Sequence, residues 1–267
     1  MNNPVLIITS FGATRNYSNQ ETMRKTFEAF LNSLARQTDE NFRLFISYHD
    51  RPNVAGVERP WIHWCPLSCD DDYEMTLVPK EYPLRPCDPI DYRAIPYGSN
   101  LTDMSRKTLS SAMWAGIWAY RQGVRDFWML RMDSDDLLAK DVVETIRSQP
   151  DEIGGVFNRK CHIFDVSSRE IGIYDYRYPT TCNALRMKIE GDELKRWFYL
   201  CTDHTLFKRH LEQNGILYKE TDWMLCITSN SGNSISGRGR IEENREAEIT
   251  PIELTEELRD RYGIDSL

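Results

Sequence analysis

Residues 126–143 read DFWMLRMDSDDLLAKDVV, and this stretch decides the fold. Its first part, 126–132, is mostly apolar, which is typical of a strand buried on both faces of a mostly parallel sheet. Three carboxylates, Asp133, Asp135 and Asp136, follow it directly. Carboxylates at a buried strand end repel one another and lose hydration unless a hard divalent cation neutralises them. The stretch therefore predicts an α/β fold with a metal-diphosphate site at the end of a central strand.

A simpler interpretation of the same motif is a polar turn. Asp135 or Asp136 would then cap a helix that begins near Leu137, and aspartate is a common N-cap. Capping needs one carboxylate rather than three, which favours the metal site. An EF-hand loop is disfavoured because it needs further oxygen ligands and a central glycine, and none follows.

The composition limits the class of protein. With 267 residues and 40% hydrophobic content, the chain is long enough for one large globular domain. Its 33 basic and 41 acidic residues give a formal net charge of −8, which argues against general binding of duplex nucleic acid. No apolar stretch approaches the roughly 20 residues that span a bilayer, and residues 1–4 lack the charged region of a secretory signal. We therefore expect a cytoplasmic protein.

Seven cysteines form an odd-numbered set spread along the chain, which fits reduced thiols better than a disulfide framework. A zinc site built from His63, Cys65, Cys69 and Cys87 is a minor alternative, because no C-x-x-C pair is present.

Strand and helix patterns alternate around the motif. Two apolar runs predict strands with a helix between them, which is a βαβ unit, and a further helix leads into the acidic strand. Residues 51–97 are rich in proline and predict mostly loop, with a short strand near 61–64. The remaining pattern predicts strands at 156–165 and 171–174 joined by a hairpin turn. The predicted helices cover 19–37, 102–123, 142–146, 206–213, a segment opening at Glu220, and a terminal surface helix at 255–262.

The βαβ start, the arginine-containing helix, the Asp-x-Asp-Asp motif and the later Glu220-Thr221-Asp222-Trp223 together resemble the GT-A nucleotide-sugar glycosyltransferases. More narrowly, they resemble inverting family 2 and its rhamnosyltransferase branch, over roughly residues 4–50 and 100–240. The resemblance implies a Rossmann-like, mostly parallel sheet flanked by helices, with a smaller mixed region on the acceptor side. It implies a single catalytic domain at 1–240, split into a nucleotide-sugar-binding half (1–136) and an acceptor half (137–240). A C-terminal surface helix or tail (241–267) follows.

The resemblance also implies a nucleotide site after the first two strands. Thr9, Phe11 and Arg15 would hold the nucleotide, and Asp50 would bond the base. Ordinary strand-end packing for Thr9 and Phe11, a solvated charge for Arg15 and a turn former at Asp50 are the alternatives.

The diphosphate would be held by two further groups of residues. Ser105-Arg106-Lys107 resembles the family's Ala-Arg-Asn stretch, so Arg106 and Lys107 would approach the diphosphate from a helix start, unless they form a solvated basic face. In the DXD motif Asp133-Ser134-Asp135, the first carboxylate would lie near the ribose and metal-bound water, with Ser134 beside the donor. Asp135 would bind Mn²⁺ or Mg²⁺.

In the acceptor half, Asp222 would be the general base that takes the proton from the acceptor hydroxyl. Asp203 or Glu220 are the alternative bases, and a plain N-cap is the alternative role for Asp222.

Two departures from the family pattern stand out. Thr221 separates an acidic pair that the family has side by side, and residues 229–233 lack an expected histidine. His204 would supply a metal-binding imidazole from another loop, or else line the acceptor site. Arg238 and Arg240 would close over the diphosphate from a Gly-rich loop, unless that loop is merely solvated.

The sequence thus predicts a divalent-metal-dependent inverting glycosyltransferase. It would move a hexosyl or rhamnosyl group from a nucleoside-diphosphate sugar to the hydroxyl of a glycan or other acceptor. A catalytically silent carbohydrate- or nucleotide-binding protein on the same fold is the main alternative. Nucleotidyltransfer is less favoured, because the glycine-rich, arginine-containing loop that it needs after the first strand is missing. The sugar, the base, the acceptor and the oligomeric state are not fixed by the sequence.

Overall fold

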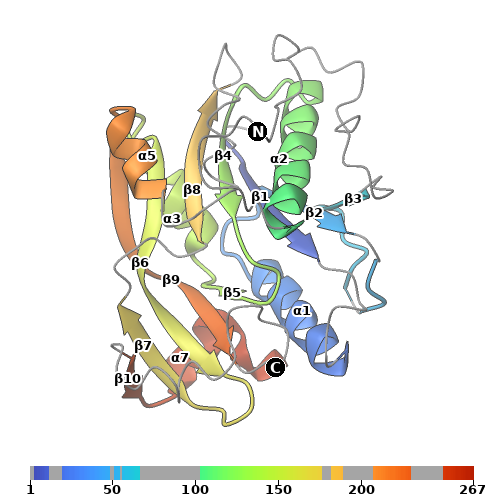
Figure 1. Cartoon of the computed structure of the whole chain (residues 1–267), viewed down its shortest axis with the longest axis vertical. Helices are drawn as coiled ribbons and strands as arrows, with labels where there is room; N and C mark the ends of the chain where they lie inside the picture. Colours follow the sequence, from blue (N-terminus) through green and yellow to red (C-terminus); the bar gives the residue numbers. More distant parts are fainter. Residues whose placement is uncertain are drawn as a thin grey trace.

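Four parallel strands form one edge of the central sheet, in the order β4, β1, β2 and β3 (Figure 1). The computed structural model describes residues 3–11, 20–48, 51–54, 56–66, 103–175, 182–188, 207–229 and 249–267. β1 is buried at every position, as expected for a strand with neighbours on both sides. The predicted α/β fold is confirmed. The four strands span Asp126–Arg131 (β4), Val5–Phe11 (β1), Phe42–Tyr48 (β2) and Ile62–Pro66 (β3).

The rest of the sheet is mixed. β8 (Asn183–Lys188) runs antiparallel to both β4 and β6 (Gly155–Asp165). β7 (Ile171–Asp175) pairs with β6, and β10 (Ile249–Ile252) pairs with β7, both in antiparallel orientation. β9 (Tyr218–Ser229) lies parallel to β6, and its second half also pairs with the two-residue β5 (Leu137–Leu138). This last pairing brings β9 next to the acidic turn that follows β4.

Helices cover both faces of the sheet (Figure 1). Side chains of β4 alternate between the two resulting cores: Trp128 and Leu130 join one, whereas Phe127 and Met129 join the other. The first core contains residues of α1 (Gln20–Ala35) and α3 (Val142–Arg147). The second contains residues of α2 (Asp103–Arg121) and α5 (Phe207–Gln213). The predicted helices at 19–37, 102–123, 142–146 and 206–213 are therefore confirmed.

The C-terminal segment is more than a surface helix. α7 (Glu256–Tyr262) begins after Thr255, whose side chain accepts a hydrogen bond from the Leu258 N–H, and it ends at Gly263 in the left-handed conformation (φ 68°). Tyr262 and Ile264 are fully buried, the latter in the short 3₁₀ helix η5 (Ile264–Ser266). The predicted helix at 255–262 is present, and most of its residues are exposed or half-buried. β10 also extends the sheet, so the described part, 249–267, packs onto the domain as well as forming a surface helix.

Two further elements differ from expectation. The segment that opens at Glu220 is a strand rather than a helix, because Met224, Leu225 and Cys226 form a consecutive buried run between β6 and β5. β8 has no counterpart in the sequence prediction. Its Arg186 carries a charge in an otherwise buried strand, and this charge is paired with Asp126 and Asp151.

Candidate functional site

Asp133 and Asp135 lie directly after β4, at the carboxyl edge of the parallel strands. Both residues are partly buried. Arg131, the last residue of β4 and two positions before Asp133, is buried. Burial, and next the negative charge of Asp133, raise the pKa of Asp135 to about 7. The two carboxylates are therefore close enough for the charge of Asp133 to act on Asp135.

Thr228 of β9 fixes the acidic turn. Its N–H donates to the Asp136 carboxylate (3.1 Å), and its hydroxyl donates to the Asp135 carbonyl oxygen. Asp136 is buried and does not cap a helix, because the chain continues as β5 and α3 begins only at Val142. The alternative in which Asp136 caps a helix that begins near Leu137 is thus wrong. Its carboxylate joins β9 to the turn, which leaves the carboxylates of Asp133 and Asp135 for other partners.

The N-terminal half of α2 lies at the same edge. The Thr108 hydroxyl is 3.4 Å from that of Ser10, near the carboxyl end of β1. Arg106 and Lys107 come just before Thr108 on this helix, so the helix start, with its free N–H groups, is at the edge where the acidic turn lies. The side chains of Arg106 and Lys107 are outside the described part of the structure.

The predicted nucleotide residues of β1 have different environments. Phe11 is buried, and its ring lies 4.8 Å from that of Phe27, so it is a core residue of the strand rather than part of a loop. Thr9 is fully buried, and its hydroxyl oxygen has no hydrogen-bond partner among the described residues. Arg15 and Asp50 lie outside the described residues.

The residues present fit a divalent cation. Within the described ranges, Asp133 and Asp135 have no ion pair, and the charged neighbour that acts on Asp135 is another carboxylate. Carboxylate oxygens are the ligands that Mg²⁺ and Mn²⁺ prefer. The described residues contain no group of three or more metal-ligating side chains, so a bound ion would complete its shell from the diphosphate, water or other residues. His204, the predicted third ligand, is outside the described part, as are Asp203 and Arg238.

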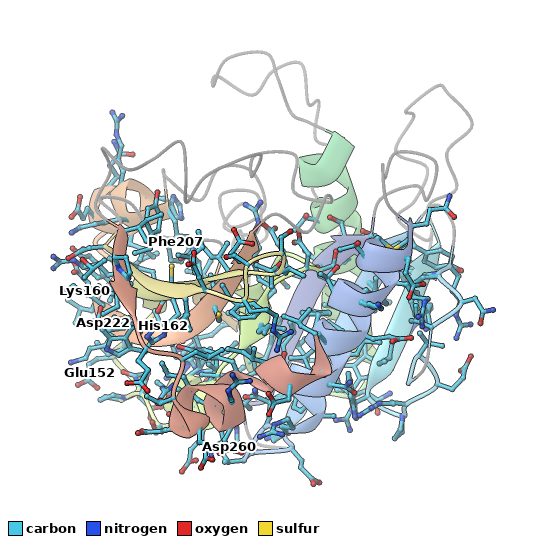
Figure 2. All side chains as sticks on the ribbon, turned by 90° about the horizontal axis from the view of Figure 1, so that it is seen from below. Glu152, Lys160, His162, Phe207, Asp222 and Asp260 are labelled. Carbon is cyan, nitrogen blue, oxygen red and sulfur yellow. The ribbon has the colours of Figure 1, made fainter. Side chains whose placement is uncertain are left out.

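Asp222 lies on β9 at a bulge in its pairing with β6. Its carboxylate is exposed and accepts a hydrogen bond from the Lys160 N–H (3.3 Å), and Figure 2 shows the two residues side by side. The next residue, Trp223, has a positive φ of 66°. Three residues, 223–225, are opposite the single residue Cys161 of β6, because Lys160 pairs with Asp222 and His162 with Cys226.

The bulge shortens the path from Asp222 to the acidic turn. Asp222 pairs with Lys160 and Thr228 pairs with Phe164. These β6 residues are four residue spacings apart, so Asp222 and Thr228 are about 13 Å apart along the sheet. Without the bulge, six spacings would separate them, or about 20 Å. Asp222 is therefore separated along the sheet from Thr228, the residue that holds the acidic turn, and the two are not in contact.

Glu220, the alternative base, is paired with cations. Lys208 of α5 lies 2.9 Å from its carboxylate, and Arg159 lies 4.0 Å away. Hydrogen bonding to Glu220 raises the pKa of Lys208. Glu220 is thus engaged by two cations, whereas the Asp222 carboxylate has no ion pair among the described residues.

Sequence reasoning missed Thr228 and Tyr262, which hold the site residues in place. Thr228 bonds the acidic turn, and Tyr262 donates its hydroxyl hydrogen to the Trp223 carbonyl oxygen. Both contacts join residues more than 35 positions apart, and one partner is a backbone atom, so no local pattern reveals them. Within the described residues, no helix is long and apolar enough to cross a membrane.

No family model and no curated protein matches the chain. Among solved structures, the chain is similar to the WbbM bifunctional glycosyltransferase in its apo form, with a TM-score of 0.35 and 9% identity over 82% of this chain and 38% of that one. It is also similar to a protein from Desulfovibrio desulfuricans G20 named as a nucleotide-diphospho-sugar transferase, with a TM-score of 0.32 and 7% identity over 90% and 91% of the two chains. The chain spans little more than a third of the first protein's length, and at these values neither similarity bears on its activity.

Proposed function

We propose that the chain is an inverting glycosyltransferase that uses a divalent cation and a nucleoside-diphosphate sugar. The observation that carries the proposal is the pair of adjacent, partly buried carboxylates, Asp133 and Asp135, at the carboxyl end of β4. Ligands of open α/β sheets bind at this edge. Two repelling carboxylates with no ion pair in the described part of the chain are costly unless a cation binds them.

On this proposal, the donor diphosphate lies between the acidic turn and the start of α2. Asp133 and Asp135 hold Mn²⁺ or Mg²⁺, which when bound neutralises charge that develops on the leaving diphosphate. Ser134 lies within the turn, and Arg106 with Lys107 contributes positive charge from the helix. Arg238 closes over the diphosphate from its loop.

The nucleotide lies beyond the ends of β1 and β2. Arg15 and Asp50 contact it directly, with Asp50 on the base. Thr9, whose buried hydroxyl has an unused acceptor, lies at the strand end. Phe11 acts only as packing below the site, since it is buried against Phe27.

Asp222 is the proposed base. Its exposed carboxylate accepts one hydrogen bond from the Lys160 N–H and has no ion pair in the described residues, so it has lone pairs left for the acceptor hydroxyl. It takes the proton of that hydroxyl while the oxygen attacks the anomeric carbon from the face opposite the diphosphate. Asp203 and His204 belong to the acceptor side, with His204 as a further metal ligand. The transferred group is a hexosyl or rhamnosyl unit.

The proposal is tested by binding before turnover. Purified protein is heated with Mn²⁺ and each of UDP, GDP, ADP, CDP and dTDP, because a ligand that binds the folded state raises the apparent melting temperature. Mn²⁺ together with at least one of these nucleoside diphosphates should raise the melting temperature more than Mn²⁺ alone or that nucleotide alone. The Asp135→Asn variant should lose this effect, whereas Glu152→Gln, an exposed carboxylate on the loop before β6, should keep it.

Donor sugars of the base identified in this way are then tested for metal-dependent release of nucleoside diphosphate. Release that is lost in Asp135→Asn supports transfer chemistry. Binding without release indicates the catalytically silent alternative. Absence of any metal-dependent nucleotide binding refutes the proposed site.

A further inference from the structure

Trp223 adopts a backbone conformation that its side chain disfavours. Its φ of 66° lies in the left-handed region, where a bulky residue is an outlier and needs support from its surroundings. It is the residue directly after Asp222 and lies within the bulge of β9. Trp223 is thus a strained residue within the bulge and directly adjacent to the proposed base.

Three contacts hold this conformation. The Tyr262 hydroxyl donates to the Trp223 carbonyl oxygen (2.8 Å), and the Trp223 ring lies 4.7 Å from the imidazole of His162 at an angle of 31°. The Met224 N–H donates to the side-chain oxygen of Asn158 (3.0 Å). The carbonyl oxygen, the side chain and the following N–H of the strained residue are thus all held by groups outside β9.

The hydrogen-bond pattern also fixes the state of His162. A tyrosine hydroxyl has one hydrogen, and Tyr262 uses it on the Trp223 carbonyl. The Nδ1 atom of His162, 2.8 Å from the same hydroxyl oxygen, must therefore carry a hydrogen and donate it. Burial, and then the charge of Arg261, lower the pKa of His162 to about 4, so the neutral ring is the form present at neutral pH. His162, Tyr262 and Trp223 form one chain of hydrogen bonds and ring contacts.

Tyr262 is itself firmly held by the C-terminal segment. Its side chain is fully buried, and the residue before it, Arg261, contacts the Asp141 carboxylate at 3.2 Å while its carbonyl oxygen accepts the Lys140 N–H. Gly263 ends the helix directly after it. Burial of the ring needs only a phenylalanine. The hydroxyl, which bonds both His162 and Trp223, is what requires a tyrosine.

We propose that Tyr262 and His162 are positioning residues that hold Asp222 in the geometry required of a base. The role in catalysis rests on the proposed function, whereas the support of the bulge rests only on the contacts described above. Removing the Tyr262 hydroxyl frees the Trp223 carbonyl, so the bulge relaxes and the Asp222 carboxylate loses its fixed direction. The acidic turn, which is held by Thr228 rather than by Tyr262, should keep its geometry.

The experiment compares Tyr262→Phe with Tyr218→Phe, which removes a hydroxyl that bonds Glu212 (3.0 Å) on α5. Amide hydrogen exchange, followed on the full-length chain, should increase at residues 222–226 in Tyr262→Phe only, with β1 and β4 unchanged. In the transfer assay, kcat should fall about 10- to 100-fold while the KM for the donor stays the same, because misplacement of a catalytic group affects the reaction step.

The same Tyr262→Phe change is also made in the Trp223→Gly variant, as a double mutant. Glycine adopts a positive φ without support, so removal of the Tyr262 hydroxyl should lower kcat much less in Trp223→Gly than in the wild type. Unchanged exchange at 222–226 overturns the positioning role whatever the activity. Increased exchange with unchanged kcat shows that the bulge is held but does not serve catalysis, which also overturns the proposal. A wild-type protein without transfer activity overturns the proposed function, and hydrogen exchange then decides alone whether Tyr262 holds the bulge.

Discussion

Protonation of His162 should make the protein labile to mild acid. The imidazole is buried against Trp223 and Tyr262, and its pKa is lowered to about 4 from an ordinary value of 6.5. Between these two values the unfolded chain binds a proton at this residue and the folded chain does not. The stability that His162 contributes therefore rises with pH in this window, is fully present above 6.5, and is lost as the pH falls towards 4.

The size of the effect follows from the shift. A difference of about 2.5 pKa units corresponds to about 3 kcal/mol once the pH is below 4, and to about 2 kcal/mol at pH 5. For a chain of this size, 2 kcal/mol lowers the melting temperature by about 4–8 °C. This contribution comes from His162 alone. The raised pKa of Asp135 acts in the opposite direction over the same pH range, so the His162 contribution has to be isolated by comparison with a variant.

The assay is urea denaturation of the wild type and of His162→Gln at pH 7.5 and pH 5.0. Glutamine cannot take up the proton, so the variant should lose about 2 kcal/mol less than the wild type between the two pH values. Burial also lowers the pKa of His63, but this residue is present in both proteins and cancels from the difference. Equal losses in the two proteins would refute the assignment of His162 as a buried neutral base.

Three further changes test other parts of the structure. Asp135→Asn removes the repulsion with Asp133, so it should raise the melting temperature of the metal-free protein by a few degrees and abolish Mn²⁺-dependent nucleotide binding. A lower melting temperature would contradict the view that the two carboxylates reduce stability. Thr228→Val removes the hydrogen bond to the Asp135 carbonyl, which should cost about 1–2 kcal/mol in urea denaturation and weaken Mn²⁺ binding measured by titration; unchanged Mn²⁺ affinity would show that the turn does not need this contact. Arg186→Met leaves the carboxylates of Asp126 and Asp151 without their shared partner. Because Asp151 is exposed and Asp126 is only partly buried, the loss should be about 1 kcal/mol in urea denaturation, and Asp126→Asn in the same chain should restore part of it.

The parallel half of the fold was predictable because its signals are local. Continuous apolar runs such as 5–8 and 127–130 are sufficient to predict buried strands, and apolar residues at helical spacing predicted α1 and α2 within two residues of their observed bounds. Gly123 and Gly215 lie at positive φ just beyond α2 and α5, a conformation that glycine adopts easily and with which helices commonly end. For these elements, the environment of each residue is set by its near neighbours in sequence.

The mixed half was less predictable because its signals depend on distant partners. The polar residues at 220–222 read as a helix start, but the buried run from Met224 to Cys226 is stabilised by β5 and β6, which lie far away in sequence. The position of Asp133 and Asp135 at a strand end was predictable from their own surroundings. The bulge that directs Asp222 was not, because it depends on a tyrosine 40 residues further along the chain.

The two halves of the proposed site are held by different means, and this has a consequence for how the chain tolerates change. The acidic turn is tied to β9 by Thr228, which lies in the buried second half of that strand, whereas Asp222 lies on the exposed bulge and is held through α7. The hydrogen bonds made by Thr228 and by the Trp223 carbonyl oxygen both involve β9, on either side of Leu225 and Cys226, which pair with β5. A shift of β9 would therefore move the proposed metal site and the proposed base together, whereas loss of the Tyr262 hydroxyl would release only the base. Tyr262→Phe should accordingly keep nucleotide binding and lose transfer, whereas variants of the acidic turn should lose both.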